Sequence, residues 1–405
     1  MSMSDAAWRQ YAIVTGNYWA FTLTDGALRM LVVLYFYELG YAPLEIALLF
    51  LFYEFFGVVT NLFGGWLATV FGLNRTMNIG LGLQIMALAM LALPDEFLSV
   101  IWVMAAQALS GIAKDLNKMS AKSAIKLLVP EDANSALYKW VALLTGSKNT
   151  LKGAGFFLGG VLLLSVGFQA AMLWMMSALI LVWFSSLVFL RKDFGKTKNK
   201  PKFAQVFSKT TEINTLAAAR LFLFAARDIW FVVALPVYFA GVLGWSHWQT
   251  GAFMACWVIC YGVVQTQAPK LTQSAGQSPD GRDAFIWGLG LTAITFVLAI
   301  AHTQAQAYTA VVLVSGLILF GIVFAINSSL HSYLIVQYAD RESVSMDVGF
   351  YYMANAAGRL LGTVFSGLLY QSFGSDGLFA CLIGSAICLM ISAVISIRLP
   401  RHIKA

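Results

Sequence analysis

Long apolar runs separated by short polar segments recur along the whole of this 405-residue chain. A run of roughly 20 apolar residues is what an α-helix needs to cross the hydrocarbon core of a bilayer. Soluble domains have about a quarter of their residues charged, whereas here only 11% are charged and 60% are hydrophobic. The runs therefore exclude a soluble fold and predict a membrane protein with many spans.

Twelve runs are predicted to be transmembrane helices, which makes the chain an all-α membrane protein. The N-terminus lacks the ordered basic, apolar and small-residue regions of a cleaved signal, so the first run is expected to be a span. The predicted spans are 11–37, 44–70, 76–93, 98–122, 138–165, 169–190, 212–240, 248–268, 284–301, 307–337, 346–371 and 377–398.

The basic residues outside the spans gather in alternate loops. The loops "ELGYAP", "LPDEFL" and "QSFGSDG" contain no Lys or Arg, whereas the intervening ones contain Arg75, Arg191, Lys270 and Arg341. Cytoplasmic loops carry the excess of Lys and Arg in membrane proteins. We therefore expect both termini to be cytoplasmic.

The longest polar stretch, "RKDFGKTKNKPKFAQVFSK" at 191–209, is strongly basic and lies near the middle of the chain. Its composition predicts a solvated cytoplasmic linker over 191–211, with contact to anionic lipid headgroups as the alternative. This linker divides the chain into an N-terminal bundle at 1–190 and a C-terminal bundle at 212–405.

The two bundles are predicted to be duplicates. Asp25 and Asp228 lie 203 residues apart, and the "GVV" at 57–59 has a counterpart at 262–264. Two six-helix halves in parallel register resemble the major facilitator fold, in which substrate binds between the halves near mid-membrane.

The segment "GGWLATVFGLNR" at 64–75 supports this resemblance. It is similar to the facilitator loop Gly-x-Leu-Ala-Asp-Arg-x-Gly-x-x-Arg, but Thr69 and Val70 replace the usual acidic and basic pair. The fold is still expected, whereas the gating salt bridge usual at this loop is not.

Several ionisable residues fall near the predicted span midpoints. A charge at the bilayer centre costs about 2.5–3.5 kcal/mol, so such residues face the bundle interior, pair or line water. The deep cations are Arg29, Lys114, Lys148, Lys152, Arg227 and Arg359, and the deep carboxylates are Asp25, Asp115 and Asp228.

Pairing within this set covers three cations and leaves about three over. Three unpaired cations cost about 8–10 kcal/mol on the same scale, which is comparable to the net stability of a domain. We therefore expect an anion to visit the interior of the bundle.

Four lysines in the fourth predicted span recur at every fourth position, at 114, 118, 122 and 126. Steps of four advance about 40° around a helix, so the lysines spiral along one face. The spiral indicates an electrostatic guide for an anion entering from the cytosol. For Lys122 and Lys126, snorkelling to the headgroups is the alternative.

The carboxylates have two possible roles. Each can be a fixed partner, Asp25 for Arg29 and Asp228 for a cation on another helix, or a coupling site that takes up a proton. Glu54 and Asp115 are candidates for the same roles.

"INSSLHSYL" in the tenth span supplies Asn327 and His331, which suit hydroxyl or phosphate contacts or helix packing equally. The chain has no Walker loop, enzyme signature or metal-ligand cluster, so neither catalysis nor a cofactor is expected.

Six stretches carry a family resemblance. They are "NYWAFTLTDGALRMLVVLYF", "LFYEFFGVVTNLFGGW", "GLNRTMNIGLGLQ", "AQALSGIAKDLNKMSAKSAIKLLVP", "WVALLTGSKNTLKGAGFFLGG" and "AARLFLFAARDIWFVVALPVYFAGVLGW". The chain resembles ArsJ, the organoarsenical efflux permease family, almost end to end and most clearly over 17–270.

This resemblance implies export of 1-arseno-3-phosphoglycerate across the bacterial inner membrane, with glyceraldehyde-3-phosphate dehydrogenase supplying the substrate. For such a two-headed anion, we expect Lys114, Lys118, Lys122, Lys148 and Lys152 to bind in the N-terminal half and Arg227 and Arg359 in the C-terminal half, with Arg29 between them. An organophosphate–phosphate exchanger, in which Arg29 and Arg227 clamp phosphate, is the alternative. A receptor that binds without carrying is a third possibility.

Overall fold

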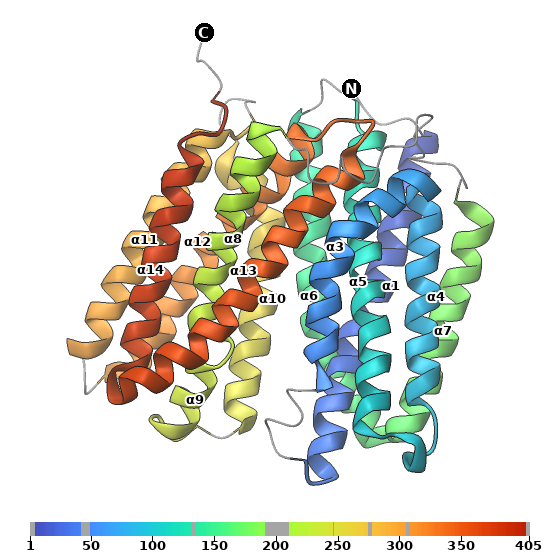
Figure 1. The fold of residues 1–405 in the computed structure, drawn as a ribbon, viewed down its shortest axis with the longest axis horizontal. Coiled ribbons are helices and arrows are strands. Elements are labelled where there is room, and N and C mark those ends of the chain that lie inside the picture. The colour runs from blue at the N-terminus through green and yellow to red at the C-terminus, as the bar shows by residue number, and fades with distance from the viewer. Residues whose placement is uncertain are drawn as a thin grey trace. The chain divides into compact units, whose positions relative to one another are not determined.

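The computed structural model describes residues 5–41, 49–130, 134–190, 210–245, 247–273, 278–304 and 308–401, and this part of the chain contains helices and no strand. The basic segment 191–209 lies outside the described residues. The first helices are α1 (Asp5–Glu38), α3 (Leu51–Phe71), α4 (Leu73–Leu91), α5 (Val100–Leu128), α6 (Asn134–Val166) and α7 (Phe168–Phe189) (Figure 1). They are followed by α8 (Thr211–Phe231), α9 (Ala234–Gly241), α10 (His247–Thr272), α11 (Gly281–Gln304), α12 (Thr309–Tyr338), α13 (Val344–Phe373) and α14 (Gly377–Ser396).

Each predicted span falls on a described helix, and the seventh corresponds to α8 and α9 together. The all-α prediction is therefore confirmed. Eight described segments are long and apolar enough to cross a membrane, with α13 and α14 counted as one segment. Helix α5, which carries the lysine spiral, is not among them.

The chain forms two compact units. The first contains Met1–Trp140, Ser147–Ser208 and Ala339–Met353, and the second contains Val141–Gly146, Lys209–Tyr338 and Ala354–Ala405. One turn and a half of α6 thus belongs to the second unit, and the beginning of α13 belongs to the first.

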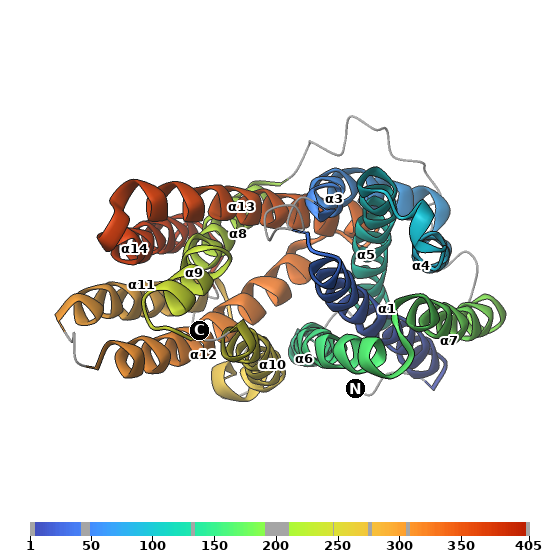
Figure 2. The ribbon, with the colours of Figure 1, turned by 90° about the horizontal axis from the view of Figure 1, so that it is seen from below.

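Helix α5 is central to the first unit because it packs on α1, α3 and α4. In the end-on view of Figure 2, it lies between α3 and α4. Buried apolar side chains from several helices, such as Leu28, Leu81, Val103 and Met172, form one core cluster there. Burial of each such side chain stabilises the packing of these helices through dispersion contacts.

The core of the second unit is aromatic. Trp230 of α8 packs edge-on against Trp257 of α10 and Phe320 of α12, with ring centroids 6.0 and 5.0 Å away. Edge-to-face pairs of this kind add about 0.5–1.5 kcal/mol beyond the area they bury. They hold α8, α10 and α12 together beside the charged residues of α8.

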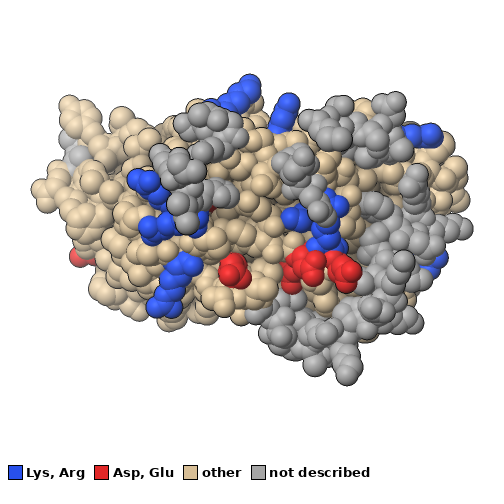
Figure 3. All heavy atoms as spheres, turned by 90° about the horizontal axis from the view of Figure 1, so that it is seen from above, with Lys and Arg blue, Asp and Glu red and all other residues tan. Residues whose placement is uncertain are grey.

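Charged side chains also reach the surface. The face drawn in Figure 3 carries several groups of Lys and Arg side chains and fewer Asp and Glu. A cytoplasmic location of the basic ends stays a prediction from the loop charges.

Candidate anion-binding site

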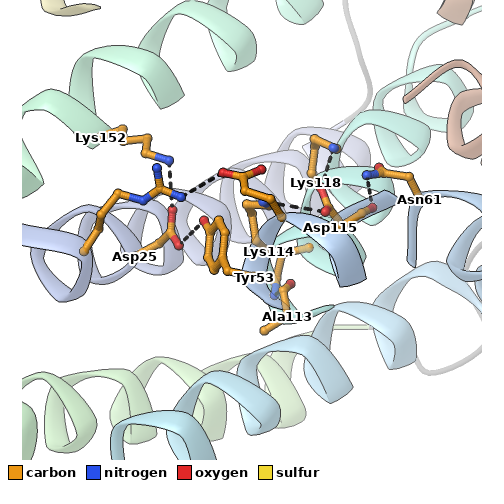
Figure 4. Close-up of polar contacts among 12 residues, drawn as sticks. Asp25, Tyr53, Asn61, Ala113, Lys114, Asp115, Lys118 and Lys152 are labelled. Carbon is orange, nitrogen blue, oxygen red and sulfur yellow. Dashed lines mark hydrogen bonds and ion pairs between the residues drawn. The ribbon is translucent and has the colours of Figure 1, made fainter. Parts of the chain in front are cut away.

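Asp25 on α1 lies at the centre of a polar network in the first unit (Figure 4). Its side chain is buried, the Tyr53 hydroxyl donates a hydrogen bond to its Oδ1 at 2.6 Å, and Lys152 Nζ lies 3.4 Å from its Oδ2. A buried carboxylate needs such partners because its desolvation is otherwise costly. Asp25 is therefore anchored by one residue of α3 and one of α6.

Glycines allow α1 and α6 to approach closely enough for this ion pair. A Cβ on Gly26 would lie 2.6 Å from the Lys152 carbonyl oxygen, and one on Gly155 would lie 2.6 Å from that of Leu23. Real side chains do not tolerate such distances. Small residues at a helix interface permit close backbone contact, and here they bring Lys152 to Asp25.

Arg29 pairs with Glu54, and the pair expected between Arg29 and Asp25 does not form. Arg29 Nη2 lies 2.9 Å from Glu54 Oε1, and its guanidinium stacks 4.7 Å from the centre of the Tyr53 ring. Glu54 lies on α3, the helix that faces Arg29, and the linear sequence does not reveal which residue of α3 comes opposite Arg29. The prediction was wrong because the one-turn spacing of Asp25 and Arg29 on α1 says nothing about their neighbours on α3.

The lysine spiral begins at a shared carboxylate. Asp115 is buried, with Lys118 Nζ 2.5 Å from its Oδ1 and Lys114 Nζ 3.7 Å from its Oδ2. The Lys114 ammonium also lies 3.9 Å from the centre of the Tyr53 ring, a cation–π contact. Two ammonium groups thus share one negative charge (Figure 4).

The spiral continues inside the unit at Lys122. This residue is only 2% exposed, and its ammonium donates a hydrogen bond to the Tyr352 hydroxyl. Lys118 lies 4.4 Å from the centre of the same ring. Tyr352 belongs to the part of α13 that is in the first unit. Lys122 therefore faces protein, which disagrees with the snorkelling alternative.

Lys148 differs from the other deep cations. It is half-buried on α6, one turn before Lys152, and within the described residues no carboxylate lies at ion-pair distance from it. The structure nevertheless has more ion pairs than the sequence predicts. Glu54 pairs with Arg29, and Asp228 pairs with both Arg227 and Arg359.

Asp228 is the corresponding carboxylate of the second unit. It is fully buried on α8, with Arg227 Nη2 2.5 Å from its Oδ1 and Arg359 Nε 3.1 Å from its Oδ2. Arg359 reaches it from α13, where a Cβ on Gly362 would lie 2.6 Å from the Ala225 carbonyl oxygen. The cation on another helix is thus Arg359.

Asn327 and His331 lie on α12 and are buried, as is a third residue that sequence reasoning missed. Among the described residues, Asn327 Oδ1 and both ring nitrogens of His331 have no hydrogen-bond partner. The missed residue is Arg220 of α8, which is 3% exposed and donates hydrogen bonds to Asn355 and Ser328 at 2.8 and 3.1 Å. A search for charges along whole spans, rather than near their midpoints, finds it.

The facilitator-like segment makes neutral contacts at its altered position. Gly72, with φ of +93°, forms the turn between α3 and α4. The Thr69 hydroxyl lies 2.6 Å from that of Ser345, which in turn donates to the Gly65 carbonyl at 2.8 Å. A hydroxyl pair therefore occupies the place of the usual acidic residue.

The charges of the first unit do not cancel. Its buried and half-buried charged residues include six cations, Arg29, Lys114, Lys118, Lys122, Lys148 and Lys152, and four carboxylates, Asp25, Glu54, Asp115 and Asp347. The described residues include no group of His, Cys, Asp and Glu that could hold a metal ion. A surplus of cations among apolar helices makes this interior a candidate site for an anion.

Two helical units, each with buried ion pairs between apolar helices, define a polytopic membrane protein of the carrier class. The comparisons with known proteins identify the family. The major facilitator superfamily model matches residues 14–277 and 216–404, so the chain belongs to that superfamily. No curated protein sequence matches the chain.

Three solved structures are similar in fold. A bacterial homologue of the iron transporter ferroportin has a TM-score of 0.74 at 14% identity, covering 96% of this chain and 98% of the homologue. The human organic anion transporter MFSD10 (TETRAN) has a TM-score of 0.72 at 15% identity, covering 96% and 99%. The E. coli fucose:proton symporter FucP has a TM-score of 0.71 at 12% identity, covering 95% and 97%. At these identities the likeness concerns the fold alone.

Proposed function

We propose that this major facilitator carrier is a secondary active efflux transporter for 1-arseno-3-phosphoglycerate, acting in the bacterial inner membrane with both termini in the cytosol. The observation that carries the proposal is the excess of cations over carboxylates in the interior of the first unit, with Lys148 lacking an ion-pair partner among the described residues. A multiply charged anion neutralises this excess when it binds. The ArsJ-like stretches supply the specific substrate.

The side chains suit phosphate and arsenate esters. Lysine presents a compact ammonium on a flexible stem, which adapts to a tetrahedral oxyanion. Lys114, Lys118, Lys148 and Lys152 are each half-buried rather than sealed in the core. Hydrogen bonds between charged groups are about twice as strong as neutral ones, so these lysines favour a substrate with several ionised oxygens.

Asp25 is the carboxylate best suited to couple binding to a second ion. It is paired with Lys152 at 3.4 Å. An incoming oxyanion that takes over Lys152 leaves Asp25 without that partner, and loss of a nearby cation favours protonation of a carboxyl group. Anion binding and protonation of Asp25 therefore favour each other, and Asp25 is the proposed group through which anion movement is coupled to proton movement.

The dehydrogenase that makes the ester, glyceraldehyde-3-phosphate dehydrogenase, is the proposed functional partner because it supplies the substrate on the cytosolic side. The human organic anion transporter MFSD10, which has a similar fold, supports the proposal of an anionic cargo.

Everted membrane vesicles provide the test. Vesicles with and without the protein are supplied with ester freshly made by the dehydrogenase, and arsenic inside them is measured with and without an imposed pH gradient. We expect uptake that depends on the protein and rises with the gradient. Equal arsenic in both kinds of vesicle contradicts the proposal.

The same vesicles discriminate the alternatives. Phosphate-driven counterflow of 3-phosphoglycerate, with no uptake of the arsenylated ester, identifies an organophosphate–phosphate exchanger. Saturable binding without flux identifies a receptor.

A further inference from the structure

Tyr53 on α3 contacts Asp25, Lys114 and Arg29, and so joins three ion-paired sets of the first unit. Its hydroxyl donates to Asp25 at 2.6 Å, and the face of its ring lies 3.9 Å from Lys114 Nζ. The side chain is 2% exposed, so both contacts are shielded from water. As an uncharged residue within an apolar run, Tyr53 is not singled out by the charge pattern.

The contacts define two groups that Tyr53 separates. The Asp25 group consists of Asp25 and Lys152, and the Asp115 group consists of Lys114, Asp115 and Lys118. In Figure 4, Tyr53 lies between them, with its hydroxyl toward Asp25 and its ring toward Lys114.

The backbone of Tyr53 is fixed as firmly as its side chain. Gly111 of α5 packs directly on the Tyr53 backbone, and Gly57, one turn further along α3, lies against Asp115. A rigid aromatic ring with two rotatable bonds loses little entropy when it is held in this way. The ring is therefore a spacer of constant length between the two groups.

We propose that Tyr53 is a positioning residue that sets the spacing of the Asp25 group and the Asp115 group, so that the first unit recognises an organic anion with two separated oxyanion ends. The inference rests on the proposed function and deepens it by naming the substrate class. It places both ends of the anion on the first unit, whereas the sequence assigned one end to each half.

The physical basis is effective concentration. Once one end of an anion is bound, the second end binds intramolecularly, and this advantage is greatest when the span of the ligand matches the separation of the two sites. Loss of the spacer frees Lys114 and Asp25 to move independently. The advantage for two-ended anions then falls, while binding of a one-ended anion changes little.

Two stable probes with the same three-carbon skeleton test this. 3-Phosphoglycerate has a phosphate and a carboxylate at opposite ends, whereas glycerol 3-phosphate has the phosphate alone. Their affinities for the purified full-length protein are measured by titration calorimetry. The wild-type protein is expected to prefer 3-phosphoglycerate.

Two substitutions separate the hydroxyl from the ring. Tyr53→Phe keeps the cation–π contact and removes the bond to Asp25, and we expect about a 3- to 10-fold loss of 3-phosphoglycerate affinity. Tyr53→Leu also removes the ring, and we expect about a 10- to 100-fold loss. The affinity for glycerol 3-phosphate is expected to change by less than about twofold, since only one group is needed.

Tyr35→Phe is the matched control, because the Tyr35 hydroxyl likewise donates to a carboxylate, that of Asp95 at 2.5 Å. Both affinities should be unchanged in it. Size-exclusion elution and thermal unfolding establish whether each variant is folded. If Tyr53→Leu does not fold, the affinities of Tyr53→Phe, which keeps the ring, decide the test.

Equal losses for both probes, or an unchanged ratio of affinities, overturn the inference. A wild-type protein that binds both probes without preference also overturns it and leaves the transport proposal standing. Conversely, Tyr53-dependent preference in a protein that does not carry the arsenylated ester supports the inference and defeats the proposed function.

Discussion

In the first unit the carboxylate of Asp25 is held by a lysine and a tyrosine, whereas in the second unit Asp228, 203 residues later, is held by two arginines. The glycines beside these pairs keep the same offset, because Gly155 and Gly159 precede Gly358 and Gly362 by 203 residues. The close helix approach is therefore common to both units, and the charged partners differ.

The change from lysine to arginine as the partner of the carboxylate distinguishes an ion pair that can change partners from one that stays fixed. Arginine presents a planar, rigid fork that fixes a carboxylate through directed hydrogen bonds, whereas lysine is a flexible point charge. Both carboxylates are buried, and exposure does not separate their cations, since the side chains of Arg227, Lys152 and Arg359 are 15%, 20% and 35% exposed. Because two arginines hold Asp228 and one lysine holds Asp25, we expect the pairing of the second unit to be fixed and that of the first unit to exchange.

The largest effect is expected from Asp228→Asn. It leaves Arg227 and Arg359 without the carboxylate between them, and removal of one partner from a buried pair costs about 3–5 kcal/mol. Asp25→Asn should cost less, because it removes the carboxylate from one paired cation, Lys152, rather than from two. Thermal unfolding of the two purified variants measures the difference, and equal midpoints would remove the distinction between the units.

Lys148→Gln is expected to impair transport without destabilising the protein. Charged hydrogen bonds contribute about 1.5–3 kcal/mol, so the loss of one contact to substrate should reduce vesicle uptake by about 10- to 100-fold. Lys139→Gln, on the same helix, is the control and should retain uptake. Normal uptake by Lys148→Gln would exclude this residue from the site.

The glycines that bring the helices together in both units lead to a prediction of smaller effects, which should be alike in the two units. Gly155→Ala and Gly362→Ala each place a Cβ 2.6 Å from a carbonyl oxygen of the facing helix, and such overpacking costs about 1–3 kcal/mol. Gly290→Ala on α11 is the control, since nothing lies within 4 Å of its added Cβ. A fall in unfolding temperature for one of the two variants alone would show that the units are not held by equivalent contacts.

The smallest effect should come from exchanging the cation types. Arg359→Lys keeps the charge and an ion pair with Asp228 but loses the directed bond from Nε, so its cost should fall below the roughly 1.5–3 kcal/mol of a whole charged hydrogen bond. Lys152→Arg is its counterpart in the first unit and should alter transport more than stability. If Arg359→Lys instead abolishes transport at unchanged stability, Arg359 binds substrate and the second unit is not merely a fixed pair.

The helices could be predicted because the length and polarity of a span depend only on consecutive residues. The same holds for the deep carboxylates Asp25, Asp115 and Asp228, because each interrupts an apolar run. Partners across helices could not be predicted, because the rotation of α3 against α1 decides whether Arg29 meets Asp25 or Glu54. Arg220 and Tyr53 were missed for different reasons, one because it lies away from a span midpoint and the other because it has no charge.

The sharing of Asp115 by Lys114 and Lys118 has a practical consequence for anyone who purifies this protein. One carboxylate cannot neutralise two ammonium groups, so the cluster retains a positive charge that small buffer anions can occupy. Sulfate or phosphate carried through from extraction to assay is then expected to compete with the substrate for this cluster. Measurements made in the salts of bulky, weakly coordinating acids should therefore give tighter apparent binding than those made in phosphate-buffered saline.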